Sequence, residues 1–218
     1  MIVTIASQKG GVGKSTVSMN LALGVAGLSA SYKVALIDAD QQLSCLETLQ
    51  NYKRANLSLY EGTKKPHRLV KSIVHKYKAL FIDTPPHSHE IMYQAAAVSR
   101  LVIIPLQPSP LDIRGVGKTV QALKVIRDKV NPKLECRFLV NRVKPRTILA
   151  NDFKVALNKH YSFPAFETMM HDREAYKQSL ITGKSVLEFK KKSPAAEEMG
   201  KILIEVATVL RMKKMLRN

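Results

Sequence analysis

The sequence predicts an α/β protein in which a doubly wound, mostly parallel sheet is flanked by helices. Short runs rich in Val, Ile, Leu and Phe alternate with helical patterns, as expected when strands are buried on both faces. The most distinctive polar residues, Gln8, Asp38, Asp40 and Asp83, follow or end three of these runs, where ligands bind in such sheets. The chain has 218 residues, and we expect residues 1–218 to form a single domain.

The strands and helices are predicted in order from this alternation. The predicted strands are Ile2–Ser7, Val34–Asp38, Ala79–Asp83, Leu101–Pro105 and Phe138–Asn141. The helical patterns between them include Thr16–Ala26, Pro66–Tyr77, Ile91–Val98 and Ile113–Val130. A last helix is expected to open at Pro194, because proline fits the first turn of a helix.

A glycine-rich turn follows the first predicted strand. It reads Gln8-Lys9-Gly10-Gly11-Val12-Gly13-Lys14-Ser15-Thr16. Glycines let successive backbone N–H groups converge on phosphate oxygens, and the next helix adds its positive N-terminal end. Lys14 can reach the β/γ-phosphates, and the Ser15 hydroxyl can ligate Mg²⁺. The turn therefore predicts a phosphate-binding loop, with Gln8 in place of the usual first glycine and Lys9 as an additional lysine.

Carboxylates end two further predicted strands. Asp38 and Asp40 follow the run Ala35-Leu36-Ile37, and Asp83 follows Leu80-Phe81-Ile82. Beside a phosphate loop, such carboxylates can support Mg²⁺ or its waters, and one of them can orient an attacking water. Asp38 or Asp40 has a simpler alternative role, which is to cap the helix expected to start near Gln41.

The charge of the chain is strongly basic and uneven. It contains 35 Lys and Arg against 17 Asp and Glu, a formal net charge of +18. Residues 1–110 hold 12 basic and 6 acidic residues, and residues 111–218 hold 23 and 11. This excess favours a polyanionic partner, nucleic acid before anionic membrane, through phosphate neutralisation and counterion release. A basic surface without such a partner is the alternative.

The remaining composition points to a cytoplasmic protein. Cys45 and Cys136 lie far apart without a C-x-x-C pattern, so we expect neither a disulfide framework nor a zinc site. The first predicted strand begins at Ile2, which leaves no room for a signal peptide. The apolar runs are too short to span a bilayer.

Taken together, these motifs resemble those of the ParA/MinD ATPases, a family with a deviant Walker A loop. The resemblance lies in Lys9–Ser15, Asp38–Asp40 and Asp83–Pro86, and it extends to about residue 186. Leu101–Asp112 is similar to the ParA branch in particular, and Phe138–Arg142 resembles the segment that contacts the adenine base. The resemblance implies a P-loop NTPase fold of the deviant Walker A type. It also implies a compact plasmid-type ParA without an N-terminal DNA-binding domain.

The resemblance implies a role for each matching residue in an ATPase that uses ATP and Mg²⁺. The implied catalytic residues are Lys9, which reaches across a nucleotide-sandwich homodimer, Lys14, which holds the β/γ-phosphates, and Asp40, which positions the hydrolytic water. The implied nucleotide-binding residues are Lys9, Gly10, Gly11, Val12, Gly13, Lys14, Ser15, Thr16, Asn141 and Arg142. The implied Mg²⁺ residues are Ser15, Asp38 and Asp83, partly through water. No arginine finger is evident, so a lysine supplied by the partner subunit would stabilise phosphate charge, and the intrinsic activity is expected to be weak.

The sequence departs from the family pattern at two positions. Gln41 stands where the family usually has proline, and His87 stands where a small residue is common. Both flank the regions expected to respond to nucleotide.

The implied function is DNA partitioning by a nucleoid-associated protein that a ParB-type, centromere-binding partner stimulates to hydrolyse ATP. The candidate contacts for non-specific DNA are Lys190, Lys191, Lys192, Arg211, Lys213 and Lys214. The last helix is expected to dock on the sheet through Met199, Ile202, Leu203, Val206, Val209 and Leu210. A MinD-like ATPase, held at a membrane by an apolar helix with basic flanks, is the alternative. A metabolic enzyme of the same superfamily is a third possibility.

Overall fold

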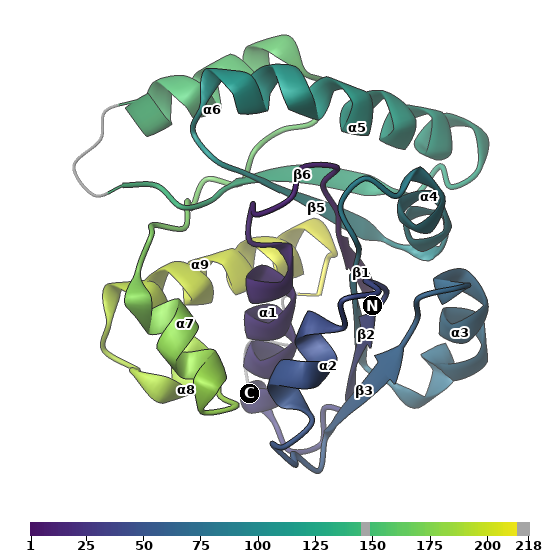
Figure 1. Ribbon diagram of the computed structural model, residues 1–218, viewed down its shortest axis with the longest axis vertical. Helices are drawn as coiled ribbons and strands as arrows, with labels where there is room; N and C mark the ends of the chain where they lie inside the picture. Colours follow the sequence, from purple (N-terminus) through teal and green to yellow (C-terminus); the bar gives the residue numbers. More distant parts are fainter. Residues whose placement is uncertain (145–148, 213–218) are drawn as a thin grey trace.

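The computed structural model describes residues 1–144 and 149–212, and it is organised around a six-stranded parallel sheet (Figure 1). The strands are β1 (Ile2–Ile5), β2 (Val34–Asp38), β3 (Leu57–Glu61), β4 (Ala79–Asp83), β5 (Leu101–Leu106) and β6 (Glu135–Val140). Their order across the sheet is β3-β2-β4-β1-β5-β6, and every pairing of neighbours is parallel. This arrangement confirms the predicted doubly wound fold class.

Helices cover both faces of the sheet (Figure 1). One face packs against α1 (Lys14–Leu28), α2 (Ser44–Leu49), α7 (Glu174–Ile181), α8 (Val186–Phe189) and α9 (Pro194–Val209). The other face packs against α3 (Pro66–Ile73), α4 (His89–Val98), α5 (Pro110–Lys129) and α6 (Leu149–His160). A 3₁₀ turn, η1 (Val74–Lys76), follows α3. No helix within the described residues is long and apolar enough to cross a bilayer.

Alternating side chains on the strands supply both layers of the core. On β5, Leu101 and Ile103 join the cluster beneath α1 and α9, whereas Val102 and Ile104 join the cluster beneath α5 and α6. All four side chains are fully buried, which explains why the sequence shows an unbroken apolar run here. The helix α1 is buried from Val17 to Ala26, because it lies between the sheet and the helices α7, α8 and α9.

The parallel register brings the predicted site residues to one edge of the sheet. Asp38 at the end of β2 lies opposite Asp83 at the end of β4, and Ile5 at the end of β1 also lies opposite Asp83. The loops that follow these strands therefore meet above the same edge. This confirms the expectation that the distinctive polar residues gather at the carboxyl ends of the strands.

Several predicted boundaries differ from the structure. The strand β3 was not predicted, because it lies at the edge of the sheet and its residues are only partly buried. The first strand ends at Ile5 rather than Ser7, and the last begins at Glu135 rather than Phe138. The second predicted helical segment ends at Ile73, where the chain tightens into η1. Pro194 does open the last helix, with Ser193 as its cap accepting a hydrogen bond from the Ala196 N–H.

Candidate functional site

The phosphate loop is shaped by two glycines with positive φ. Gly11 has φ 73° and Gly13 has φ 90°, a region that side chains with a Cβ rarely adopt. A Cβ on Gly13 would also lie 2.4 Å from the Asn141 Nδ2 atom. Gly13 caps α1, and within the described residues no side chain bonds the first amides of this helix. These amides are therefore available to an anion.

Lys14 is the first residue of α1 and lies inside the loop. It is 7% exposed, and its Nζ atom donates a hydrogen bond to the Lys9 carbonyl oxygen at 3.3 Å. Burial lowers the pKa of Lys14, and the charges of Asp83 and Asp40 oppose this shift. A partly desolvated ammonium group that is held over the loop gains strongly from a phosphate oxygen, because low dielectric strengthens the attraction.

Asp83 lies directly beneath the loop and is fully buried. Its carboxylate accepts hydrogen bonds from the Ser15 hydroxyl at 2.6 Å and the Ser18 hydroxyl at 2.9 Å. Burial raises the pKa of Asp83 to about 6, although both hydroxyl bonds lower it. The Ser15 hydroxyl and the Asp83 carboxylate thus form a compact pair of oxygen donors. Such hard ligands, one of them anionic, suit Mg²⁺, so these residues fit the predicted ion.

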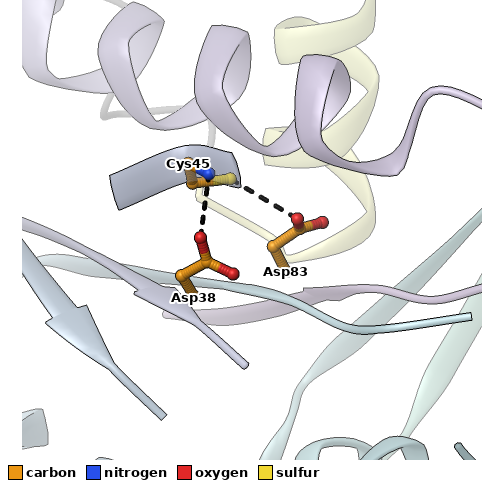
Figure 2. A group of neighbouring side chains, drawn as sticks. All are labelled: Asp38, Cys45 and Asp83. Atoms are coloured by element: carbon orange, nitrogen blue, oxygen red, sulfur yellow. Dashed lines mark hydrogen bonds between the residues drawn. The ribbon is translucent and has the colours of Figure 1, made fainter. Parts of the chain in front are cut away.

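Asp38 is close to Asp83 but is occupied by backbone groups (Figure 2). One of its oxygens accepts the N–H groups of Cys45 and Leu46, at 2.8 and 3.2 Å, and the other accepts that of Asp40 at 3.1 Å. Burial raises the pKa of Asp38, and these three bonds oppose the rise. In this structure Asp38 therefore holds the start of α2, which matches the alternative of a helix-capping aspartate. Its place in the Mg²⁺ shell stays a prediction.

Cys45 completes the buried group in Figure 2. Its Sγ atom lies 3.4 Å from an oxygen of Asp83, and its side chain is fully buried. Burial and the charges of Asp83 and Asp38 raise its pKa well above the ordinary value for a thiol. A neutral thiol is a poor ligand for Mg²⁺, so Cys45 acts here as a packing group beside the carboxylates.

Asp40 lies two residues beyond the end of β2 and is half-buried. Its Oδ1 atom accepts a hydrogen bond from the Gln42 N–H at 3.0 Å. A cleft of about 400 Å³ opens beside it. The cleft is lined by Ala39, Asp40, Gln41, Gln42, Thr63, Pro85, Pro86, His87, Ser88 and Ile91. Both residues that depart from the family pattern, Gln41 and His87, therefore lie in this cleft together with Asp40.

Lys9 points away from its own phosphate cradle. Its Nζ atom forms an ion pair with Asp112, whose side chain is 1% exposed. The other oxygen of Asp112 accepts the Gln107 N–H at 2.9 Å, and the Gln107 side chain donates to the Gly11 carbonyl at 3.2 Å. The turn between β5 and α5 therefore holds the phosphate loop at two points. The sequence singled out Lys9 but not Asp112.

The predicted base-contacting segment lies beside the loop. The Asn141 side chain donates to the Val12 carbonyl at 2.8 Å, and it accepts the Arg142 N–H. Asn141 and Arg142 line a pocket together with Gly13 and Thr16. The structure thus brings the loop and the predicted adenine segment together.

The far wall of this pocket was not predicted from the sequence. It is formed by Met170, His171, Asp172, Arg173, Tyr176 and Lys177. Glu198 holds this wall in place, since it accepts hydrogen bonds from His171, Arg173 and the Tyr176 hydroxyl. In the sequence, the only trace of this wall is Glu198 itself, a glutamate among the apolar residues of the last helix.

Four of the six basic residues predicted to contact DNA lie within the part of the chain that the structure describes. Lys190, Lys191 and Lys192 are exposed on the turn between α8 and α9, and Arg211 is exposed after α9. Lys213 and Lys214 lie outside the described residues. The helix α9 is docked as expected, with Met199, Ile202 and Leu203 buried in the core.

The sequence and the fold both match known proteins. The family model for the CobQ/CobB/MinD/ParA nucleotide-binding domain matches residues 3–186. The chain belongs to this family. The predicted resemblance to ParA and MinD is thereby confirmed.

Relatives of known name in this family are similar over almost their whole length. Maintenance of carboxysome distribution protein A from Halothiobacillus neapolitanus is 29% identical over 94% of this chain and 95% of its own. The protein of the same name from Gloeobacter kilaueensis is 30% identical over 90% and 88%. The chromosome-partitioning ATPase Soj from Thermus thermophilus is 26% identical over 94% of both chains.

Solved structures confirm the fold of the family. The ATP complex of a Cyanothece McdA variant superposes with a TM-score of 0.75 at 18% identity, covering 97% of this chain and 96% of that chain. MinD from Pyrococcus horikoshii, complexed with Mg-ADP, also gives a TM-score of 0.75, at 19% identity over 97% and 98%.

We expect Asp83 to make the nucleotide-free domain less stable as pH rises from about 4 to about 6. An aspartate in an unfolded chain titrates near 3.9, whereas the pKa of Asp83 is raised to about 6. Between these values the folded chain keeps a proton that the unfolded chain has lost, so the free energy of unfolding falls. The full loss, above about pH 6, is about 2–3 kcal/mol.

Urea unfolding of the wild type and of Asp83→Asn without nucleotide tests this expectation. Asparagine cannot ionise, so the variant should gain stability over the wild type at pH 7.5 and lose that advantage near pH 4. A stability difference that does not change with pH would contradict it.

Proposed function

We propose that this protein is a ParA-type ATPase with one ATPase domain over residues 1–218, which uses ATP and Mg²⁺ to switch between a free and a DNA-bound state. ATP binding drives homodimer formation, and the homodimer binds DNA without sequence preference. Slow intrinsic hydrolysis is stimulated by a ParB-type partner and releases the DNA. The observation that carries the proposal is the Ser15–Asp83 hydroxyl–carboxylate pair directly beneath a glycine loop that contains Lys14.

Each residue at this edge has a definite task in the proposal. The loop amides and Lys14 bind the β/γ-phosphates. Ser15 and Asp83 hold Mg²⁺, which when bound offsets phosphate charge. Asn141 and Arg142 border the base. Asp40, beside an open cleft, orients the water that attacks the γ-phosphate.

Lys9 acts across the dimer in this proposal. Within one chain its ammonium group is paired with Asp112, outside its own phosphate cradle. When two chains face each other, Lys9 exchanges this carboxylate for the phosphates bound by the partner subunit. The more highly charged triphosphate favours the exchange, while the buried carboxylate left behind opposes it. The Lys9–Asp112 pair therefore sets part of the cost of dimer formation.

Replacing Asp112 by asparagine should strengthen ATP-dependent dimerisation about tenfold, since release of Lys9 no longer leaves a buried charge unpaired. Asparagine retains an oxygen acceptor for the Gln107 N–H, so the turn keeps its shape. Sedimentation velocity at several protein concentrations measures the change, with Asp128→Asn on the exposed side of α5 as the control. Unchanged or weaker dimerisation of a folded Asp112→Asn variant would contradict the exchange.

Charge and helix docking favour DNA over a membrane as the partner surface. The net charge is +18, and Lys190, Lys191, Lys192 and Arg211 are exposed. The apolar face of α9 is packed in the core, and the only large hydrophobic side chain exposed on the described part of this helix is Ile204, which does not make the apolar face that a MinD-like membrane helix requires. We therefore place the protein in the cytoplasm, on the nucleoid.

The cellular object that this protein distributes, its cargo, is proposed only as a class. The relatives named for carboxysome distribution, at 29% and 30% identity, and the relative named for chromosome partitioning, at 26%, each match about nine tenths or more of this chain. Both names describe the distribution of a large cellular object. We propose that a partner bound to such an object, a plasmid, a chromosome or a protein compartment, stimulates hydrolysis.

A DNA retention assay tests the proposed switch. Random-sequence duplex should be retained strongly with ATP and Mg²⁺, and weakly with ADP or without nucleotide, with affinity that falls steeply with salt. Equal retention in the three nucleotide states would refute the switch. ATP-dependent sedimentation with anionic vesicles, without DNA binding, would support the membrane alternative instead.

A further inference from the structure

A continuous basic surface runs along α3 and the residues on either side of it. We call it the α3 face, and it consists of Lys64, Lys65, Arg68, Lys71, His75 and Lys76. All six residues are exposed. Pro66, Val70 and Ile73, on the opposite side of the helix, are buried. Arg68 and Lys71, three residues apart, lie on one side of α3, whereas Lys64 and Lys65 precede the helix and His75 and Lys76 lie in η1, which follows it.

Acidic residues are absent from the stretch of sequence that carries this surface. Residues 62–82 contain no Asp or Glu. Within the described part of the chain, none of the Lys and Arg residues of the α3 face forms an ion pair with a carboxylate. By contrast, Lys154, Arg173, Lys177 and Lys201 on or near other helices each pair with a glutamate. The α3 face therefore keeps its full positive charge toward solvent.

The lysine run between α8 and α9 is a weaker candidate for the same role. Lys190, Lys191 and Lys192 stand between Glu188 and Glu197 in the sequence. They occupy a short turn and offer three positive charges, against the five Lys and Arg residues of the α3 face. The two glutamates are themselves paired with Arg54 and Lys201, so this run is the weaker candidate because it is short.

The α3 face begins at the candidate site. The Gly62 N–H donates to the Asp38 carbonyl oxygen at 2.7 Å, and Thr63 lines the cleft that also contains Asp40. Lys64 and Lys65 follow immediately. A movement of the segment from Asp38 to Asp40 on nucleotide binding would therefore be transmitted directly to the first two lysines of this surface.

We propose that the α3 face is the main contact of this protein with the phosphate backbone of duplex DNA. This inference rests on the proposed function, and it assigns the DNA surface to a helix that the sequence did not single out. The eight residues of α3 span about 12 Å at the rise of a helix, a length over which duplex DNA presents about seven phosphate charges. A membrane fits less well, because the apolar side of α3 is packed against β2, β4 and α4.

Two triple variants with equal charge loss test the assignment. One is Lys64→Gln, Arg68→Gln and Lys71→Gln, and the matched control is Lys190→Gln, Lys191→Gln and Lys192→Gln. All six side chains are exposed, and thermal unfolding with and without ATP checks that fold and nucleotide binding persist. Anisotropy of a labelled random-sequence duplex, with ATP and Mg²⁺, is measured across about 50–200 mM salt.

The α3 variant should bind at least about tenfold more weakly, and the slope of log affinity against log salt should fall in magnitude by about two to three. The control variant should lose about threefold or less in affinity for the duplex.

Equal losses of affinity in the two variants, or a larger loss in the control, would overturn the α3 assignment while leaving the proposed function intact. If the wild-type protein does not bind duplex DNA in the presence of ATP, both the proposed function and this inference are refuted. If the wild type binds anionic vesicles in the presence of ATP, and only the α3 variant loses this binding, the surface that the α3 face contacts is a membrane and not DNA.

Discussion

Replacement of Lys14 by alanine is expected to weaken nucleotide binding by about 100-fold and to abolish every nucleotide-dependent property of this protein. The Lys14 ammonium group is buried at the start of α1, and its hydrogen bond to the Lys9 carbonyl keeps it inside the loop. A charge-assisted bond to a phosphate in such a place contributes about 3 kcal/mol, which corresponds to about 100-fold in affinity. Calorimetric titration with ATP and Mg²⁺ measures the loss.

The same substitution should not weaken the nucleotide-free fold. Burial lowers the pKa of Lys14, so the fold bears a cost for this charge, and alanine removes it. The thermal midpoint without nucleotide should stay at or above that of the wild type, while the stabilisation by ATP disappears. Lys129→Ala at the exposed end of α5 serves as the control. ATP affinity unchanged in Lys14→Ala would show that nucleotide binds somewhere other than the glycine loop.

The central strands of this fold were predictable because their burial leaves a direct mark on the sequence. The strands β2, β4 and β5 are buried along their whole length. Their short, nearly continuous runs of apolar residues are typical of strands covered on both faces. The edge strand β3 carries no such mark, because each of its residues keeps some exposure. Its place beside β2 is set by tertiary packing, which local sequence patterns do not report.

The roles of the carboxylates were only partly predictable. The sequence placed Asp38 and Asp83 at the ends of two strands, which the structure confirms, and the register shows that these strands are neighbours in the sheet. The sequence left open whether Asp38 ligates a metal ion or caps a helix. That choice depends on where α2 begins, and the helix starts at Ser44 rather than near Gln41. The extra residues let the chain turn back, so that the first amides of α2 point at the Asp38 carboxylate.

The partners of Lys9 and of the pocket wall could not be predicted from local sequence. Asp112 lies 103 positions from Lys9 along the chain, and a lone aspartate in the first turn of a helix is ordinary. Glu198 joins three side chains from the segment before α7 and from α7 itself. Both contacts arise because crossover connections bring distant segments to one edge of the sheet, and only the assembled fold shows which residues meet there.

Replacement of Asp40 by alanine is expected to lower the rate of ATP hydrolysis about 100-fold while leaving nucleotide affinity nearly unchanged. In the proposed function Asp40 orients the attacking water, and loss of a residue in such a role costs about two orders of magnitude or more. The side chain is half-buried and accepts a hydrogen bond from the Gln42 N–H, so the fold tolerates its removal. Phosphate release under single-turnover conditions measures the rate.

This substitution separates hydrolysis from binding, which Lys14→Ala does not. With ATP and Mg²⁺, Asp40→Ala should remain dimeric and hold duplex DNA for far longer than the wild type, whereas Lys14→Ala should release it. Asp128→Ala, which removes an exposed carboxylate on α5, should behave like the wild type. If Asp40 only caps the turn before α2, the variant should lose about 1 kcal/mol of stability and hydrolyse ATP at the wild-type rate. The lifetime of the ATP-bound complex on DNA therefore decides between a catalytic and a structural role for Asp40.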